Sequence, residues 1–120
     1  MMDIVVVDHS FVNTSHRKRW KFLSERHDVS VTLIVPRVWY SNWFGEEVEY
    51  RPDQVSDGKY EVRTLPTTSK RDWMKYFFIS QDLEFRSIDP DLVHVQYAPM
   101  ALIHHQVLIY KKLWGSDIKY

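Results

Sequence analysis

A short run of apolar, mostly β-branched residues near the amino terminus constrains the fold more than any other feature of the sequence. Residues 4–7, Ile-Val-Val-Val, contain no polar side chain, and such a run is typical of a strand that is buried on both faces. Central strands of parallel sheets have this property, because helices cover both sides of the sheet. The run therefore predicts the central strand of an α/β fold.

Length and composition indicate one globular domain over residues 1–120. Hydrophobic residues make up 44% of the chain, and it contains no cysteine, so we expect a core without disulfides or zinc–thiolate sites. Lysine plus arginine equals aspartate plus glutamate at 16 each, so the net charge does not favour nucleic acid as a partner. No apolar run reaches the roughly 18 residues that cross a bilayer, which predicts a cytoplasmic protein.

The rest of the chain alternates strand and helix patterns. We expect strands at 29–35, 60–65 and 92–96, a minor edge strand at 47–50, the opening of another strand at 117–120, and helices at 16–26, 74–88 and 99–114. Residues 37–45 look the least ordered. This alternation predicts a Rossmann-like three-layer sandwich with a mostly parallel sheet.

Polar side chains follow the first and the last of the predicted central strands. If the sheet order is 3-2-1-4-5, these two strands are neighbours whose connections leave in opposite directions, and a crevice forms where they end. Hydroxyl, amide and imidazole groups there suit a polyhydroxylated ligand. The predicted ligand-binding residues are Asp8, His9, Ser10, Asn13, Gln96 and Tyr97.

Several common chemistries lack their sequence signals. Residues 8–13 contain no glycine, so the loop does not match a dinucleotide fingerprint, and no Walker A loop is present. We therefore expect no cofactor. A phospho-accepting role for Asp8 is disfavoured, because Ser10 stands where a phosphatase would have its second aspartate. His104 and His105 are adjacent on a predicted helix and point to different faces, so we expect no metal site.

Two segments leave a surface role open. Basic residues crowd the first half of the 16–26 helix, including Arg17 and Lys18, and they form either a solvated face or a contact for phosphate or anionic lipid. The aromatic segment 37–45, with Trp39 and Trp43, either covers the sheet edge or seats the protein on a membrane or a sugar. A peripheral position at the inner face of the membrane is thus one alternative.

Two stretches resemble the amino-terminal domain of retaining, two-domain glycosyltransferases of the family 4 type, which have the GT-B architecture. Residues 23–31, LSERHDVSV, are similar to the family's L-x-x-R-H-D-V-x-V segment. Residues 89–96, DPDLVHVQ, are similar to its PDVVHVH strand. Here residues 9–13 replace the glycine pair of the family's first loop, and Gln96 replaces the second histidine of the strand.

The resemblance implies the acceptor-binding domain of an enzyme that moves a sugar from a nucleotide-sugar donor to a polyhydroxylated or lipid-linked acceptor. In that family a carboxyl-terminal domain holds the donor through paired glutamates, so the resemblance implies a truncated or split enzyme that is inactive alone. It carries a binding role to Asp8, His9, Gln96 and Tyr97, and assigns no catalytic residue. The alternative is a non-catalytic α/β module that sits on a partner or an anionic membrane.

Overall fold

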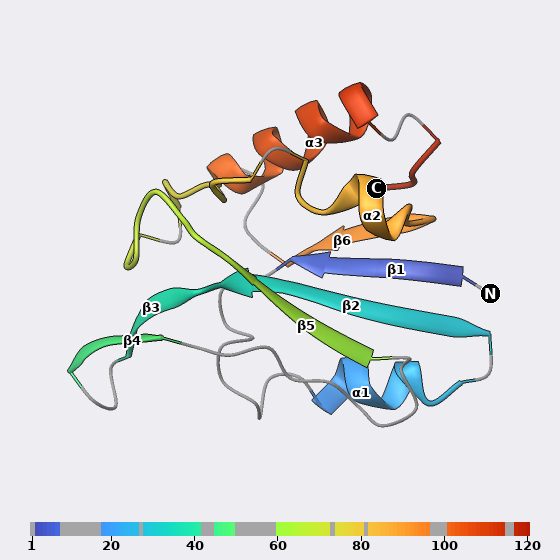
Figure 1. Cartoon of the computed structure of the whole chain (residues 1–120), viewed down its shortest axis with the longest axis horizontal. Coiled ribbons are helices and arrows are strands. Elements are labelled where there is room, and N and C mark those ends of the chain that lie inside the picture. Colours follow the sequence, from blue (N-terminus) through green and yellow to red (C-terminus); the bar gives the residue numbers. More distant parts are fainter. Residues whose placement is uncertain are drawn as a thin grey trace.

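A computed structural model describes residues 2–7, 18–26, 28–41, 45–49, 60–72, 74–80, 82–96, 101–114 and 117–120. Within these ranges the chain forms six strands and three helices (Figure 1). They are β1 (Met2–Val7), α1 (Lys18–Ser24), β2 (Val29–Pro36), β3 (Val38–Ser41), β4 (Glu46–Glu49), β5 (Tyr60–Leu65), α2 (Phe85–Ile88), β6 (Leu92–Val95) and α3 (Leu102–Trp114).

The main sheet has four parallel strands in the order β5-β2-β1-β6. Strand β1 is internal, as the apolar run predicts, and Ile4 pairs with Val31 of β2 on one side and Leu92 of β6 on the other. In chain order this arrangement is 3-2-1-4. The expected α/β fold with a mostly parallel sheet is therefore confirmed.

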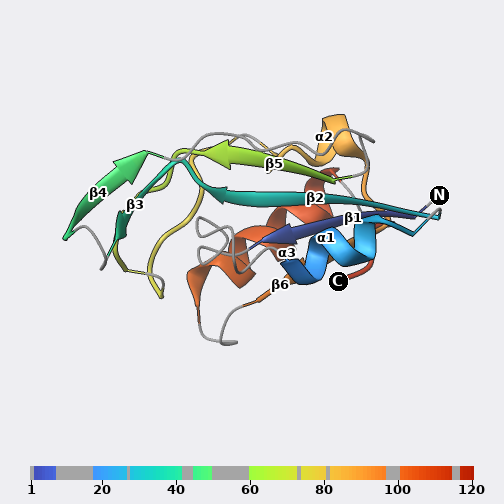
Figure 2. The same ribbon diagram turned by 90° about the horizontal axis from the view of Figure 1, so that it is seen from below.

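Helices cover the two faces of the sheet and form two hydrophobic cores. Ile4 and Val6 point to the core that contains Trp20 of α1. Val5 and Val7 point to the other core, which α2 and α3 close. Because successive strand side chains alternate between faces, an uninterrupted apolar run is what a strand between two helical layers requires. Figures 1 and 2 show α1 on the opposite side of the sheet from α2 and α3.

The prediction of a helix at 74–88 is wrong for most of that range. The chain is extended through Tyr76 and Phe78, which are buried, while Phe77 and Ile79 between them are exposed. Phe78 bridges Thr67 in an antiparallel arrangement. The apolar spacing that suggested a helix thus belongs to an extended segment whose side chains alternate between buried and exposed. Within the predicted range 74–88, only α2 is helical.

Left-handed backbone conformations border α2. Leu83 and Glu84 precede the helix and Asp89 follows it, all with positive φ. The helix stops before Asp89, as expected for a residue that precedes proline. The chain then enters β6 directly, which positions α2 beside the amino end of that strand.

The segment expected to be the least ordered contains a strand. β3 pairs antiparallel with β4, with Val38 opposite Glu49, and this two-stranded sheet is separate from the main one. Gly45 precedes β4 with a φ of 65°, a conformation that favours glycine. Of the 47–50 edge strand, residues 47–49 lie in β4, which pairs with β3.

Among the described strands of the main sheet, β6 lies at the edge and has one full neighbour, β1. His94 on β6 is exposed, so this predicted strand is not fully buried. Lys119 makes a single parallel bridge to Leu92 on the outer side of β6, which agrees with the expected opening of another strand.

Candidate functional site

The parallel strands β1 and β6 end side by side, and the helices that follow them lie on opposite faces. Val7 pairs with Val95 at this edge. Trp20 of α1 and Ile103 of α3 belong to the two different cores. In open α/β sheets, such a switch in the direction of the connections creates a crevice at the carboxyl ends of the strands. The fold therefore positions a candidate ligand site here.

Gln96 follows β6 at this edge and is held by both its backbone and its side chain. Its amide N–H donates to the carbonyl oxygen of Val7 at 3.2 Å. Its side-chain Oε1 accepts a hydrogen bond from Nε1 of Trp20, also at 3.2 Å. Gln96 thus joins the end of β1, the end of β6 and helix α1, and it is half-buried.

Trp20 forms the floor under this edge on the α1 side. Its side chain is 9% exposed and packs in the core with Ile4 and Val6. The ring of His94 lies 5.4 Å from the Trp20 ring, centroid to centroid. His94 pairs with Val6, so the side chains of His94 and Val6 point to the same face of the sheet, the one that α1 covers. Trp20, His94 and Gln96 therefore form one polar and aromatic cluster.

Sequence reasoning recovered only part of this cluster. It predicted Gln96 as a ligand-binding residue but did not connect it with Trp20. An indole N–H on an inward helix position, which needs an acceptor when buried, was the available signal. The other predicted ligand-binding residues lie outside the described part of the chain: Asp8, His9, Ser10, Asn13 and Tyr97.

The residues expected at a membrane or anion contact differ in their exposure. Lys18 is exposed at the start of α1. Trp39 is only 6% exposed and its ring packs edge-on against Tyr76. Burial therefore corrects the expectation that Trp39 contacts a membrane, and favours the alternative in which the aromatic segment covers the sheet edge. Arg17 and Trp43 lie outside the described residues.

Phe22 is an exposed residue that sequence reasoning missed. Its side chain on α1 is 76% exposed, the largest value among the exposed large hydrophobic residues of the described chain. Lys18, Lys21 and Arg26 are exposed on the same short segment. The signal was its position two residues after Trp20, which on a helix points to a different face.

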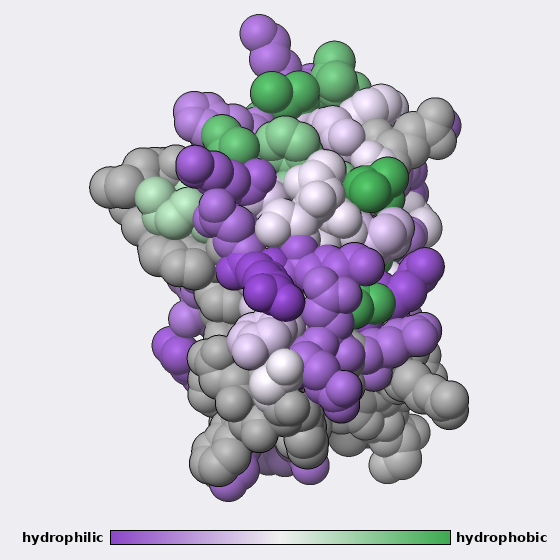
Figure 3. All heavy atoms as spheres, turned by 90° about the vertical axis from the view of Figure 1, so that its left-hand side faces the viewer, coloured by the Kyte–Doolittle hydropathy of each residue, from purple (hydrophilic) through white to green (hydrophobic). Residues whose placement is uncertain are grey.

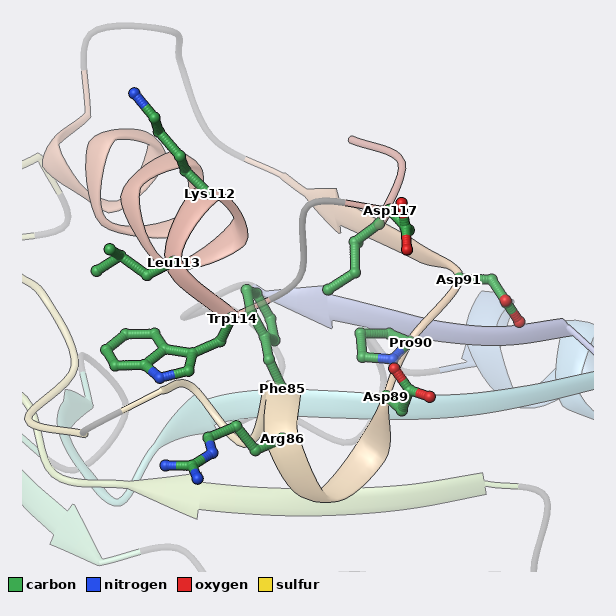
Figure 4. A pocket seen from close by; sticks show the side chains of 10 residues that line it. Phe85, Arg86, Asp89, Pro90, Asp91, Lys112, Leu113, Trp114 and Asp117 are labelled. Carbon is green, nitrogen blue, oxygen red and sulfur yellow. The ribbon is translucent and has the colours of Figure 1, made fainter.

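A hollow of about 720 Å³ lies at the opposite end of the sheet, near the amino end of β6 (Figure 4). Helix α2, the end of α3 and residues 117–118 line it. Its charged side chains point apart: Arg86 and Asp89 leave α2 in different directions, and Lys112 extends away from Asp91. Among the described residues that line the hollow, no group of polar atoms is directed at one point.

One hydrogen-bonded pair attaches the last described segment to α3. Nδ1 of His104 contacts the hydroxyl of Tyr120. Burial lowers the pKa of His104 below its ordinary value of 6.5, and the neighbouring His105 lowers it further. Burial also raises the pKa of Tyr120. Both shifts favour the neutral forms of the two side chains in the folded protein.

Comparisons with known proteins add no relative. No family model, curated protein or solved structure matches the chain significantly. Within the described ranges, no three or more His, Asp or Glu residues are grouped so that they could hold a metal ion. No helix of the described chain is long and apolar enough to cross a membrane.

Proposed function

We propose that the chain is the acceptor-binding domain of a retaining glycosyltransferase with the GT-B architecture. The strand order β5-β2-β1-β6 supports this proposal, because it brings together the two strand ends that the resemblance assigns to the acceptor. The two motif-like stretches, residues 23–31 and 89–96, support it further. A nucleotide-sugar donor would be held by a separate domain, and the chain alone would bind an acceptor without transferring sugar.

The single observation that carries the proposal is the position of Gln96. It lies at the switch point between β1 and β6, where open α/β sheets bind ligands. Its amide group and the exposed imidazole of His94 can exchange hydrogen bonds with the hydroxyl groups of a sugar. Trp20 beneath them supplies an apolar floor.

Fusion to a donor-binding domain of the family that the chain resembles tests this function. The fused protein should release nucleoside diphosphate from a nucleotide-sugar when a sugar or lipid-linked acceptor is added. Gln96→Ala and His9→Ala should each reduce that rate about tenfold or more, as expected for removal of one or two hydrogen bonds to substrate. A matched change far from the edge, His105→Ala, should leave it unchanged. Unchanged rates in both edge variants would contradict the proposal.

A second candidate function is attachment to an anionic membrane, and the exposure of Phe22 favours it. This ring stands beside the exposed cations Lys18 and Lys21 on α1. Apolar and basic side chains together are typical of segments that lie on anionic lipid. Such attachment would place the protein at the cytoplasmic face of a membrane, and it is compatible with a lipid-linked acceptor.

Sedimentation with vesicles of phosphatidylglycerol and phosphatidylcholine tests the membrane contact. Binding should weaken as salt is raised, because the contact includes exposed charges. Phe22→Ala should weaken it roughly tenfold, since burying a phenylalanine is worth about 1.5–3 kcal/mol. Phe77→Ala, which changes an exposed ring elsewhere, is the control. No binding at low salt would discard this function.

A further inference from the structure

Within the described part of the chain, only the oxygen of the Gln96 side-chain amide has a hydrogen-bond partner. Its Oε1 accepts from Trp20, but none of the described residues offers an acceptor to its Nε2. The side chain is only half-buried and stands at the ligand edge of the sheet. Among the described residues, nothing competes with a ligand for this donor.

The orientation of this amide is determined by its partner. An indole N–H donates and does not accept, whereas a glutamine amide has one face that accepts and one that donates. The Oε1 atom must therefore face Trp20, and Nε2 must face away from it. Reversal would set two donors against each other, so the amide keeps the orientation in which Oε1 accepts from Trp20.

Trp20 itself is held firmly. It is 9% exposed in a core of strand residues, and His94 packs against its ring. Seventy-six positions separate Trp20 from Gln96 in the chain. The hydrogen bond therefore connects the helix after β1 to the end of β6, the two sides of the candidate crevice.

We propose that Trp20 is a positioning residue that fixes the Gln96 amide, so that Nε2 donates a hydrogen bond to an oxygen acceptor of the ligand at the carboxyl edge. This inference rests on the proposed function, because it concerns the same site. It adds the polarity of the contact: the edge offers a donor here, and the ligand supplies an oxygen, from a sugar hydroxyl or from a phosphate group.

A second glutamine shows what a purely structural amide looks like in this protein. Gln106 on α3 is 8% exposed, and both of its side-chain polar atoms are satisfied by Phe78. Its Oε1 accepts from the Phe78 N–H at 2.8 Å, and its Nε2 donates to the Phe78 carbonyl oxygen at 2.6 Å. Gln96 differs in that none of the described residues accepts a hydrogen bond from its Nε2.

Hydrogen exchange of the indole N–H tests the positioning without any ligand. In NMR spectra the Trp20 indole proton should exchange at least tenfold more slowly than that of Trp114, which is 37% exposed. Gln96→Leu should remove most of this protection, and Gln96→Glu should keep it, because a carboxylate oxygen can still accept. Protection that survives Gln96→Leu, or is absent in the wild type, would overturn the inference.

Titration of the labelled chain with methyl α-D-mannoside, and separately with inorganic phosphate, tests the ligand contact. The side-chain NH₂ signal of Gln96 should shift saturably with at least one probe. A response to mannoside identifies a sugar hydroxyl as the source of the oxygen, and a response to phosphate alone identifies a phosphate group. In Trp20→Phe, the Kd measured from this signal should rise at least threefold, because the amide can then turn.

Failure of the inference and failure of the proposed function give different spectra. If the backbone amides of Val7 and Val95 shift while the Gln96 NH₂ signal does not, the edge binds the probe and only the donor role is wrong. If neither probe shifts any of these three signals, the proposed function is wrong and the inference falls with it. An unchanged Kd in a folded Trp20→Phe variant would overturn the positioning role.

Discussion

The two ends of the parallel sheet differ in how their polar groups are arranged. At the carboxyl end, Trp20 and Gln96 form a directed hydrogen bond, and His94 lies against the same ring. At the amino end, a hollow of about 720 Å³ is lined by both acidic and basic side chains that point apart (Figure 4). Figure 3 views the side of the molecule toward which the strands of the main sheet run; its described surface is hydrophilic across its middle, and hydrophobic residues gather above, on the α3 side.

This difference shows that the volume of a hollow alone does not indicate a ligand-binding site. A ligand is oriented by a few polar groups that converge on it, and the carboxyl end has an oriented donor while the amino end has none. The connections of β1 and β6 also diverge only at the carboxyl end. The amino-end hollow is better explained as the outer surface of the contact between α2 and α3.

The largest expected effect concerns the wall of the amino-end hollow. Phe85 is 1% exposed and belongs to the core between the sheet and α3. Phe85→Ala should lower the free energy of unfolding by about 3–5 kcal/mol, measured by urea denaturation. The milder Phe85→Leu should leave probe binding at the carboxyl end unchanged. A loss below about 1 kcal/mol in Phe85→Ala would mean that this wall is not structural.

The two glutamines offer a matched pair of substitutions. Gln106→Glu removes the donor to the Phe78 carbonyl and places a carboxylate in a buried position, so it should cost about 3 kcal/mol of stability. Gln96→Glu keeps an acceptor for Trp20 and should cost less than about 1 kcal/mol. Urea denaturation of both variants checks the difference. Equal costs would contradict the distinction between a structural and a ligand-facing amide.

Trp114 tests whether the hollow takes part in binding. Trp114 is 37% exposed, and its ring packs edge-on against Tyr110, at 5.1 Å between centroids. Trp114→Ala should lower stability by about 1 kcal/mol or less, and leave the Kd for mannoside unchanged. Calorimetric titration or NMR provides the measurement. A severalfold weaker Kd would move the site from the carboxyl to the amino end.

The smallest expected effect is a pH dependence of the last described segment. Because burial lowers the pKa of His104 in the folded chain, the unfolded chain binds more protons below pH 6.5. The stability that neutral His104 provides is therefore present above that pH, and is lost as pH falls toward the lowered pKa. The difference in unfolding free energy between wild type and His104→Asn should shrink on acidification from about pH 7.5 to about 5.5. A difference that grows would contradict the burial of neutral His104.

Local pattern was sufficient for the strands of the main sheet and insufficient for residues 74–84. The run at 4–7 indicates a strand buried on both faces, because an amphipathic element of that length would include a polar residue. Residues 76–79 are apolar at every position, so their spacing fits either period. Gln106, far along the chain, decides in favour of the extended form by bonding both backbone groups of Phe78.

The candidate site shows the same limit. Gln96 could be predicted because polar residues at the ends of central parallel strands share one edge. The hydrogen bond from Trp20 could not, since it joins positions that are distant in the chain and depends on how α1 packs. The exposure of His94 could not be predicted either. It follows from the place of β6 at the edge of the described sheet, and four residues of sequence do not distinguish an edge strand from an internal one.

A chemical-shift map of the labelled wild-type chain with methyl α-D-mannoside tests the central claim most directly. If the carboxyl end between β1 and β6 is the ligand site, the largest shifts will fall on the backbone amides of Val7 and Val95 and on both amide groups of Gln96. Largest shifts at Arg86, Asp117 and Ile118, around the amino-end hollow, would contradict it.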